Sequence, residues 1–311
     1  MAVLAITAPI FLLMALGWLA ARGAIVQAEH IRGMGRFVIN FALPALIIHA
    51  LSEQPLDEMF NGHYLLAYGL GSLATLALGL ALTFGLQRRR LDHAAIEALG
   101  MATANSGFIG YPVAAMVIGQ SAGIALALCM LVENMLMLPI CLTLAESGRQ
   151  QQGSLIRTLT ATFSRLGRTP VFIAIIGGAL LSLSGIRLPG WLSQAVDMLA
   201  SASAPVALFV IGGTLYGLKV RGMYRRVGQI ALAKLILHPL MVLLFFQLFP
   251  LEDTALMTGA LLIAGAPMLS IYPIFGARFA MDGLCAAALL TATVASFFTL
   301  SVALWLLGAA S

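Results

Sequence analysis

The sequence predicts an all-α polytopic membrane protein in which ten transmembrane helices form two inverted repeats of five helices. Three observations predict this fold class. Hydrophobic residues make up 61% of the 311 positions and charged residues 9%, and the mean hydropathy is +1.00, which excludes a soluble domain of this length. Prolines recur at one fixed spacing in the two halves, and basic residues gather in alternate loops.

Ten apolar stretches follow one another with short connections between them. We place the spans near residues 4–22, 36–52, 63–86, 95–119, 122–145, 169–186, 194–218, 227–250, 254–277 and 283–308. Their lengths fit the roughly 20 apolar residues that a helix needs to cross a bilayer. The first stretch lacks a basic leader and is long for a signal peptide, so we expect it to remain as the first span.

The internal repeat has a spacing of 161 residues. It pairs Pro9 with Pro170, Pro44 with Pro205, Pro112 with Pro273, Gly17 with Gly178 and Tyr111 with Tyr272. Because each half has an odd number of spans, the second half crosses the membrane in the opposite sense. We therefore expect a first five-helix repeat at 1–146, a cytoplasmic connector at 147–168 and a second repeat at 169–311. The connector is interpreted as a linker, with an amphipathic surface helix as the alternative. Inverted repeats with helix breaks in mid-membrane are typical of secondary transporters.

Basic residues mark one side of the membrane. Of the 17 lysines and arginines, 15 lie in the loops after spans 1, 3, 5, 7 and 9, while Arg187 lies opposite and Lys234 lies inside span 8. The opposite loops carry Glu53, Asp57, Glu58, Glu252 and Asp253. The positive-inside rule then places both termini outside the cytoplasm of a cell (inner) membrane. The same distribution argues against a nucleic-acid partner, although the formal net charge is +5.

Spans 4 and 9 contain residues that interrupt a helix. Span 4 reads Asn105-Ser106-Gly107-Phe108-Ile109-Gly110-Tyr111-Pro112, and span 9 reads Pro267-Met268-Leu269-Ser270-Ile271-Tyr272-Pro273. Proline and glycine are unfavourable inside a helix. In a bilayer, a broken helix persists only where protein or a cavity satisfies the freed backbone groups. We expect the two breaks to cross at the membrane centre; the alternative is that the prolines only kink two packed helices.

The breaks have an electrostatic consequence. Pro112 and Pro273 suit the first position of a new half-helix, so the unpaired amides of 113–115 and of 274–276 are expected to face the membrane centre from opposite sides. A small anion is the natural occupant of such a site. The candidate binding residues are Asn105, Ser106, Gly107, Gly110, Tyr111, Pro112, Ser270, Tyr272 and Pro273. Asn40, Pro44, Ser203 and Pro205 of spans 2 and 7 either line the same cavity or, for the two prolines, only kink their helices.

Four polar residues inside spans are candidates for ion coupling: Glu133, Asn134, Lys234 and His238. Glu133 either binds a proton or sodium ion or serves as a structural hydrogen-bond partner. For Lys234 the favoured interpretation is snorkelling to the cytoplasmic face, and the alternatives are pairing with Glu133 or attracting the substrate. His238 is a proton carrier or a packing residue. The three cysteines lack paired or metal-ligand spacing and are interpreted as small buried hydrophobic residues, so no metal site is expected. No cofactor and no catalytic residue are expected either.

The motif Asn-x-Gly-Phe-x-Gly-x-Pro at 105–112, the Leu43-Pro44 break after Asn40 and the five-plus-five layout resemble the auxin efflux carrier family, with the bacterial branch of malonate carriers most similar. The resemblance covers essentially the whole chain. It implies a fold like that of the sodium/proton antiporters and bile-acid transporters, an organic anion at the crossing of spans 4 and 9, and an elevator-like motion. By match to the motif, Asn105, Pro112 and Pro273 carry over as crossing residues. Plant members of the family often have asparagine near the second crossing, where this chain has Ser270 and Tyr272. They can also carry a long central loop, which is absent here. These differences favour a carboxylate smaller than auxin.

The leading hypothesis is therefore a secondary transporter of a small, malonate-like organic acid anion, with a proton or a sodium ion as the candidate coupling partner. A homodimer in the lipid bilayer is a candidate assembly. The alternatives are an intramembrane enzyme and a membrane channel or sensor. Against an enzyme stands the lack of any recognisable Ser/His, paired-aspartate or metal-ligand pattern within the spans.

Overall fold

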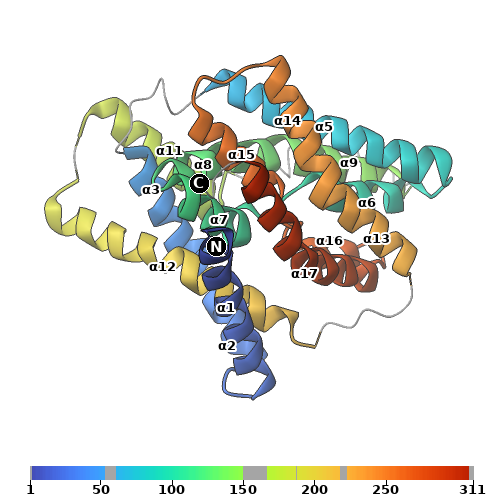
Figure 1. Cartoon of the computed structure of the whole chain (residues 1–311), viewed down its shortest axis with the longest axis horizontal. Helices are drawn as coiled ribbons and strands as arrows, with labels where there is room; N and C mark the ends of the chain where they lie inside the picture. The colour runs from blue at the N-terminus through green and yellow to red at the C-terminus, as the bar shows by residue number, and fades with distance from the viewer. Residues whose placement is uncertain (1, 53–60, 150–166, 187, 218–222, 308–311) are drawn as a thin grey trace.

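The computed structural model describes residues 2–52, 61–149, 167–186, 188–217 and 223–307, with side chains from residue 8 onward (Figure 1). Among these described residues, seven helical stretches are long and apolar enough to cross a membrane: Ala28–Ser52, Gly62–Leu86, Leu91–Ile118, Ser121–Ser147, Gly190–Leu215, Tyr224–Leu248 and Asp282–Leu306. Three shorter apolar helices are Ala8–Arg22, Pro170–Ser184 and Thr254–Ala264. The prediction of an all-helical, multi-pass membrane protein is confirmed, while the count of ten spans stays a prediction.

The described part of the first half contains α1 (Ala2–Arg22), α2 (Ala28–Phe37), η1 (Val38–Ala42), α3 (Leu43–Ser52), α5 (Gly62–Leu80), η2 (Ala81–Leu86), α6 (Leu91–Ala102), η3 (Ser106–Gly110), α7 (Tyr111–Ile118), α8 (Ser121–Val132), η4 (Glu133–Met137) and α9 (Leu138–Ser147). The second half contains α11 (Pro170–Ser184), α12 (Gly190–Leu215), α13 (Tyr224–Leu232), η5 (Ala233–Leu237), α14 (His238–Leu248), α15 (Thr254–Ala264), α16 (Tyr272–Ala277) and α17 (Asp282–Leu306). Most of the predicted connector, at 150–166, lies outside the described residues, as do Glu53, Asp57, Glu58 and Arg187.

Four of the wide π-helical turns precede a proline. The turns η1, η3, η4 and η5 each end two residues before Pro44, Pro112, Pro139 or Pro239. A proline ring clashes with the carbonyl of the preceding turn, and a widened turn moves that carbonyl away. These helices therefore continue past their prolines. Pro205, by contrast, lies inside an uninterrupted α-helix, α12.

The helices group into two bundles. In the first bundle, α1 packs on α12, α11 packs on α3, and α2 and α3 also contact α12. In the second bundle, α5 packs on α14 and α6, α15 packs on α7 and α8, and α17 packs on α13 and α16. Figure 1 shows the first bundle at the lower left and most of the second at the right. The bundles meet where α3 contacts α8, α12 contacts η3, and α1 contacts α17.

Two glycines of the repeat occupy equivalent contacts in the first bundle. A Cβ atom on Gly17 of α1 would overlap the backbone of Phe209 in α12, and one on Gly178 of α11 would lie 2.9 Å from Leu51 Cβ in α3. Small residues let membrane helices approach closely. The first helix of each half therefore packs on the second helix of the other half through a glycine at the same repeat position.

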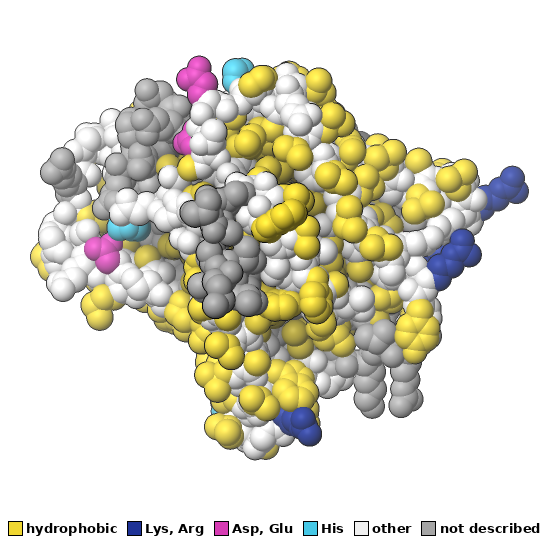
Figure 2. Space-filling model, viewed as in Figure 1, with side chains coloured by type: hydrophobic (Ala, Val, Ile, Leu, Met, Phe, Trp, Pro, Cys, Tyr) yellow, Lys and Arg dark blue, Asp and Glu magenta, His cyan; other side chains and the backbone are white. Residues whose placement is uncertain are grey.

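On the face of the molecule that Figure 2 shows, the charged side chains lie at the margins. Figure 2 shows a face dominated by hydrophobic side chains, with basic side chains at its lower and right edges and acidic ones at its upper and left edges. Such a separation of basic and acidic edges by an apolar band is what the loop charges of the sequence predict.

Candidate functional site

Two helical spans are interrupted, and their interruptions touch. The first lies at 103–105, between α6 and η3, and the second at 265–271, between α15 and α16. The backbone N–H of Asn105 donates to the carbonyl of Pro267 at 2.7 Å, and the Asn105 side-chain amide donates to Ser270 Oγ at 2.7 Å. Backbone groups freed by one break are thus satisfied by the other, as a broken membrane helix requires.

The half-helix of span 4 begins earlier than expected. Helical structure resumes at Ser106, and the N–H of Tyr111 donates to the Ser106 carbonyl, so Pro112 lies inside the half-helix and the amides of 113–115 are not at its amino end. In span 9 the helix begins at Tyr272, one residue before Pro273, and the N–H groups of Ile274 and Phe275 both donate to the Ile271 carbonyl, at 2.9 and 3.3 Å. The prediction that two sets of unpaired amides face the membrane centre is therefore wrong. The π-helical turn places the amides of 113–115 inside the half-helix, and the turn before α16 gives those of Ile274 and Phe275 a hydrogen-bond acceptor.

Glu133 occupies the amino end of the span 4 half-helix. Its Oε1 accepts from the backbone N–H of Ala104 at 2.8 Å and from the Tyr68 hydroxyl at 3.2 Å, and its Oε2 accepts from the Ser106 hydroxyl at 2.6 Å. The residue is 2% exposed. A carboxylate is favoured at the positive end of a helix. The anion at this position is thus the protein's own side chain.

Lys234 occupies a helix end of the opposite polarity. Its Nζ donates to the carbonyl of Ala264, the last residue of α15, at 2.5 Å. A cation is favoured at the negative, carboxyl end of a helix. The side chain is fully buried, so the interpretation of Lys234 as a snorkelling residue is wrong. No ion pair joins it to Glu133 among the described residues.

His238 connects Lys234 to α5. Nδ1 of His238 lies 2.9 Å from Lys234 Nζ, and its Nε2 lies 3.0 Å from Ser72 Oγ. With Lys234 as an ammonium, which can only donate, Nδ1 is the acceptor and Nε2 carries the proton toward Ser72. The Tyr68 ring packs edge-on against His238 with centroids 5.9 Å apart. We call Tyr68, Ser72, Ser106, Glu133, Lys234 and His238 the buried polar cluster.

Sequence reasoning missed Tyr68 and Ser72. Both are fully buried polar residues on one helix, α5. Their spacing of four residues places them on one helix face, and that spacing is the signal that could have identified them.

Other candidate residues pack the crossing without offering it a polar group. A Cβ on Gly107 would lie 2.9 Å from Leu43, the neighbour of buried Pro44, and a Cβ on Gly110 would lie 3.2 Å from the backbone of Ile263. Tyr272 is fully buried, and its hydroxyl donates to the Ile96 carbonyl at 3.1 Å, toward α6.

The remaining candidates lie apart from the buried polar cluster. Asn40 is exposed, and its amide donates to the Arg36 carbonyl of the same helix. Asn134 likewise donates to Met130 and faces a small hollow against α11. Pro205 is exposed. Ser203 is buried, and within the described structure its Oγ has no hydrogen-bond partner.

A pocket of about 310 Å³ lies between the two bundles, and Tyr111 joins it to the crossing region. Its polar lining residues include His49 of α3, Tyr111 of α7 and Gln120 of the α7–α8 turn. His49 Nδ1 lies 2.8 Å from Asp197 Oδ1 of α12. The pocket is large enough for a small organic acid, and its wall joins a helix of the first bundle to helices of the second.

The chain is similar in sequence to several known proteins. A protein of Rhizobium meliloti (strain 1021) named "Putative malonate transporter" is 26% identical over 302 residues, which cover 96% of this chain and 94% of that protein. "Uncharacterized transporter YfdV" of Escherichia coli (strain K12) is 27% identical over 241 residues, 76% of each chain. The "Lysosomal cholesterol signaling protein" of Mus musculus is 24% identical over 94% of this chain and 36% of its own length. A family described as "Membrane transport protein" matches residues 2–306. The chain therefore belongs to the Mem_trans family, the auxin efflux carriers that the sequence resembles, and is a multi-pass membrane transport protein.

Proposed function

We propose that this protein is a secondary transporter that carries a small organic acid anion, of the size and charge of malonate, across the cell membrane. The single observation that carries the proposal is the contact of two broken helices at Asn105. Paired helix breaks are where secondary transporters bind their substrates. The name of the Rhizobium relative supports malonate as the first substrate to test.

The substrate site of this proposal lies at the Asn105–Ser270 contact. Asn105 is 3% exposed, whereas Ser270 is only partly buried, so the contact has one accessible side. The amide and hydroxyl donors of these residues suit a carboxylate oxygen. Binding would replace the Asn105–Ser270 hydrogen bond by bonds to the substrate. Because this hydrogen bond joins the two breaks, binding of the substrate would change how the breaks are held relative to each other.

Charge balance favours cotransport of a cation. The buried polar cluster contains one acidic residue, Glu133, and one basic residue, Lys234, whose charges compensate. A bound anion would add an uncompensated charge inside the membrane, which is costly. A proton or sodium ion taken up at Glu133 would offset it and would loosen the carboxylate from Ala104 and Ser106.

An inverted repeat and an elevator-like motion complete the proposal. Gly17 and Gly178 make equivalent contacts in the two halves, as two copies of one five-helix unit would. The two breaks and the buried polar cluster belong to the second bundle, while α1–α3, α11 and α12 form the first. Sliding of the second bundle along the first would carry the crossing from one side of the membrane to the other.

One observation favours the enzyme alternative: Ser72 Oγ lies 3.0 Å from His238 Nε2. Such a pair is a nucleophile and base only if Nε2 can accept the serine proton. A charged Lys234 at Nδ1 would fix the opposite tautomer, and both side chains are fully buried. Within the described residues no group of three metal-ligating side chains occurs either. The geometry favours a carrier.

Uptake of labelled malonate, succinate and citrate into proteoliposomes tests the proposal. We expect saturable uptake that accelerates when unlabelled substrate is trapped inside. Asn105→Ala is expected to lower uptake by about tenfold, since it removes a hydrogen bond at the site worth about 1–1.5 kcal/mol. The matched control is Asn134→Ala, which removes an amide bonded to its own helix. Absence of saturable flux for every acid, or equal flux in the two variants, would contradict the proposal.

A further inference from the structure

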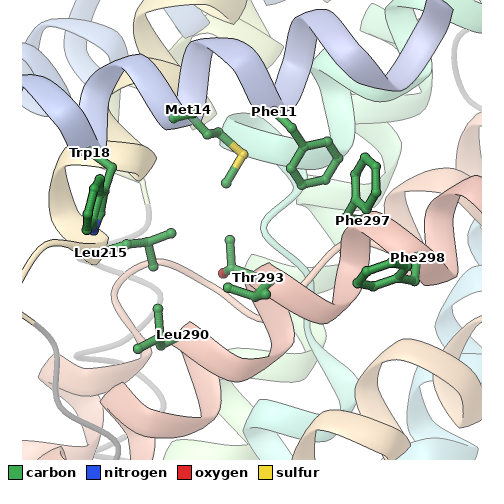
Figure 3. A pocket seen from close by; sticks show the side chains of 10 residues that line it. Phe11, Met14, Trp18, Leu215, Leu290, Thr293, Phe297 and Phe298 are labelled. Carbon is green, nitrogen blue, oxygen red and sulfur yellow. The ribbon is translucent and has the colours of Figure 1, made fainter. Parts of the chain in front are cut away.

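A second cavity, which shares no lining residue with the crossing, lies on the surface between α1 and α17. It is a groove of about 460 Å³ whose walls come from both bundles, since α1 belongs to the first and α17 to the second. Figure 3 shows Phe11, Met14 and Trp18 of α1 facing Leu290, Thr293 and Phe297 of α17, with Leu215 at the end of α12 beside Trp18.

The lining of the groove is apolar throughout. Thr293 is its one lining residue with a hydroxyl group, and that hydroxyl donates to the Leu289 carbonyl of its own helix at 2.7 Å. Val294 and Phe298 line the groove and are 58% and 66% exposed. In a membrane protein such surface faces lipid tails, so the groove offers a hydrocarbon chain a place to lie.

The ends of the groove differ. At one end the rings of Phe11 and Phe297 close it edge-to-face, with centroids 4.6 Å apart. At the other end Trp18 packs edge-on against Tyr216 at 6.1 Å, and the guanidinium carbon of Arg22 lies 5.1 Å from the Trp18 ring. Tryptophan and tyrosine prefer the headgroup level of a bilayer, and arginine binds phosphate.

The length of the groove matches one leaflet. From Leu290 to Phe298 a helix rises about 12 Å, close to half of the hydrocarbon core of about 30 Å. The mouth at Trp18 and Arg22 lies on the side of the basic loops, where anionic lipids are attracted. We propose that the groove binds one anionic phospholipid, with an acyl chain between α1 and α17 and its phosphate at Arg22.

Quenching of Trp18 fluorescence by lipids with brominated acyl chains tests this inference independently of transport. The chain has three tryptophans, so Trp191→Phe with Trp305→Phe leaves Trp18 alone. In phosphatidylcholine vesicles, we expect brominated phosphatidylglycerol to quench Trp18 saturably and with about fivefold preference over brominated phosphatidylcholine, the preference expected for one basic side chain at an anionic surface. Arg22→Gln should remove the headgroup preference and keep quenching by the chain.

Ala15→Phe is expected to fill the groove and reduce quenching severalfold, whereas Leu16→Phe, on the lipid-facing side of the same helix, should leave it unchanged. If Ala15→Phe does not fold, the headgroup preference and its loss in Arg22→Gln decide the question alone. Quenching that rises in proportion to the bromolipid fraction for both headgroups would overturn the inference. So would shielding of Trp18 from every lipid together with crosslinking to a second copy, which would assign the groove to a dimer interface.

Discussion

Glu133 and Lys234 place opposite charges at helix ends of opposite polarity. Glu133 accepts from Ala104 and Ser106 at the start of one half-helix, and Lys234 donates to Ala264 at the end of another. Each charge is stabilised by the partial charge of the helix end that it contacts. The two residues therefore allow helices to end inside a membrane, and any ion that binds Glu133 changes the stability of the span 4 break.

Replacement of Glu133 by glutamine is expected to preserve the fold and abolish the dependence of uptake on the coupling ion. The glutamine carbonyl can still accept from the Ala104 N–H, and the Ser106 hydroxyl can turn to accept from the new amide. The negative charge that binds a proton or sodium ion is lost. Uptake into proteoliposomes under an imposed pH or sodium gradient measures the effect. If the gradient dependence of this variant equals that of the parent protein, Glu133 is a structural residue only.

The contrasting variant is Glu133→Ala. It leaves the Ala104 N–H and the Ser106 hydroxyl without their acceptor, at a cost of about 1–3 kcal/mol for each buried group. Its melting temperature in detergent should therefore lie clearly below that of Glu133→Gln.

Lys234→Met is expected to destabilise the protein, because the Ala264 carbonyl and His238 Nδ1 lose their donor at about 1–3 kcal/mol each. Combining it with Glu133→Gln removes both charges of the buried polar cluster. Each single variant leaves one buried charge without its opposite charge, whereas the double variant leaves none. The double variant should therefore lose less stability than the sum of the single losses. Thermal melts of the four proteins measure this coupling, with exposed Arg225→Gln as the control. Strict additivity would show that the two charges do not compensate each other.

Some residues of this site could be predicted from the sequence and others could not. Glu133, Lys234 and His238 are conspicuous as titratable residues inside apolar stretches, and such residues are expensive in a membrane. Their partners Tyr68 and Ser72 carry no charge and lie in a span without a break, so composition does not mark them. The ends of helices that Glu133 and Lys234 contact depend on tertiary packing, which a single sequence does not reveal.

At the scale of elements, the breaks in spans 4 and 9 were predictable because glycine and proline are concentrated there. The start of the half-helix was not, since it moved from Pro112 to Ser106. The π turn η3 lets the helix run through Pro112, and sequence alone does not distinguish a proline that starts a helix from one that a widened turn accommodates. Prolines therefore locate an irregular segment but not its helix ends.

Gly178→Leu tests the packing of α11 on α3. A Cβ at Gly178 would lie 2.9 Å from Leu51 Cβ, so the larger side chain must push the helices apart, and overpacking of this kind costs about 1–3 kcal/mol. We expect a lower melting temperature and less protein in the membrane. Gly177→Leu is the matched control, because a Cβ at Gly177 meets no atom of the described structure within 4 Å. Equal stability of the two variants would show that α11 does not depend on this close contact.

At the scale of the whole molecule, the division into two bundles was not foreseen from the sequence in detail. Apolar periodicity identifies spans but gives no partner for each face, because lipid and protein favour the same apolar side chains. The repeat-related glycines Gly17 and Gly178 were visible in the sequence, yet their contacts with α12 and α3 became apparent only in the structure. A groove between α1 and α17 likewise depends on how the two bundles meet.

The relation of α1 to α17 leads to a prediction about both chain ends. Phe11 contacts Phe297, while Trp18 lines the same groove as Leu290, so the two helices run antiparallel and their outer ends, at Ala2 and Leu306, point the same way. The basic loops lie at the opposite ends of these helices, after Arg22 and before Asp282, which by the positive-inside rule is the cytoplasmic side. A reporter enzyme that is active only outside the cytoplasm should therefore be active when fused after Ser311 or before the first span. A reporter that is active only inside the cytoplasm should be active when inserted in the 147–168 connector. A terminal reporter that is active in the cytoplasm would reverse the orientation, and with it the leaflet in which the groove at Trp18 opens.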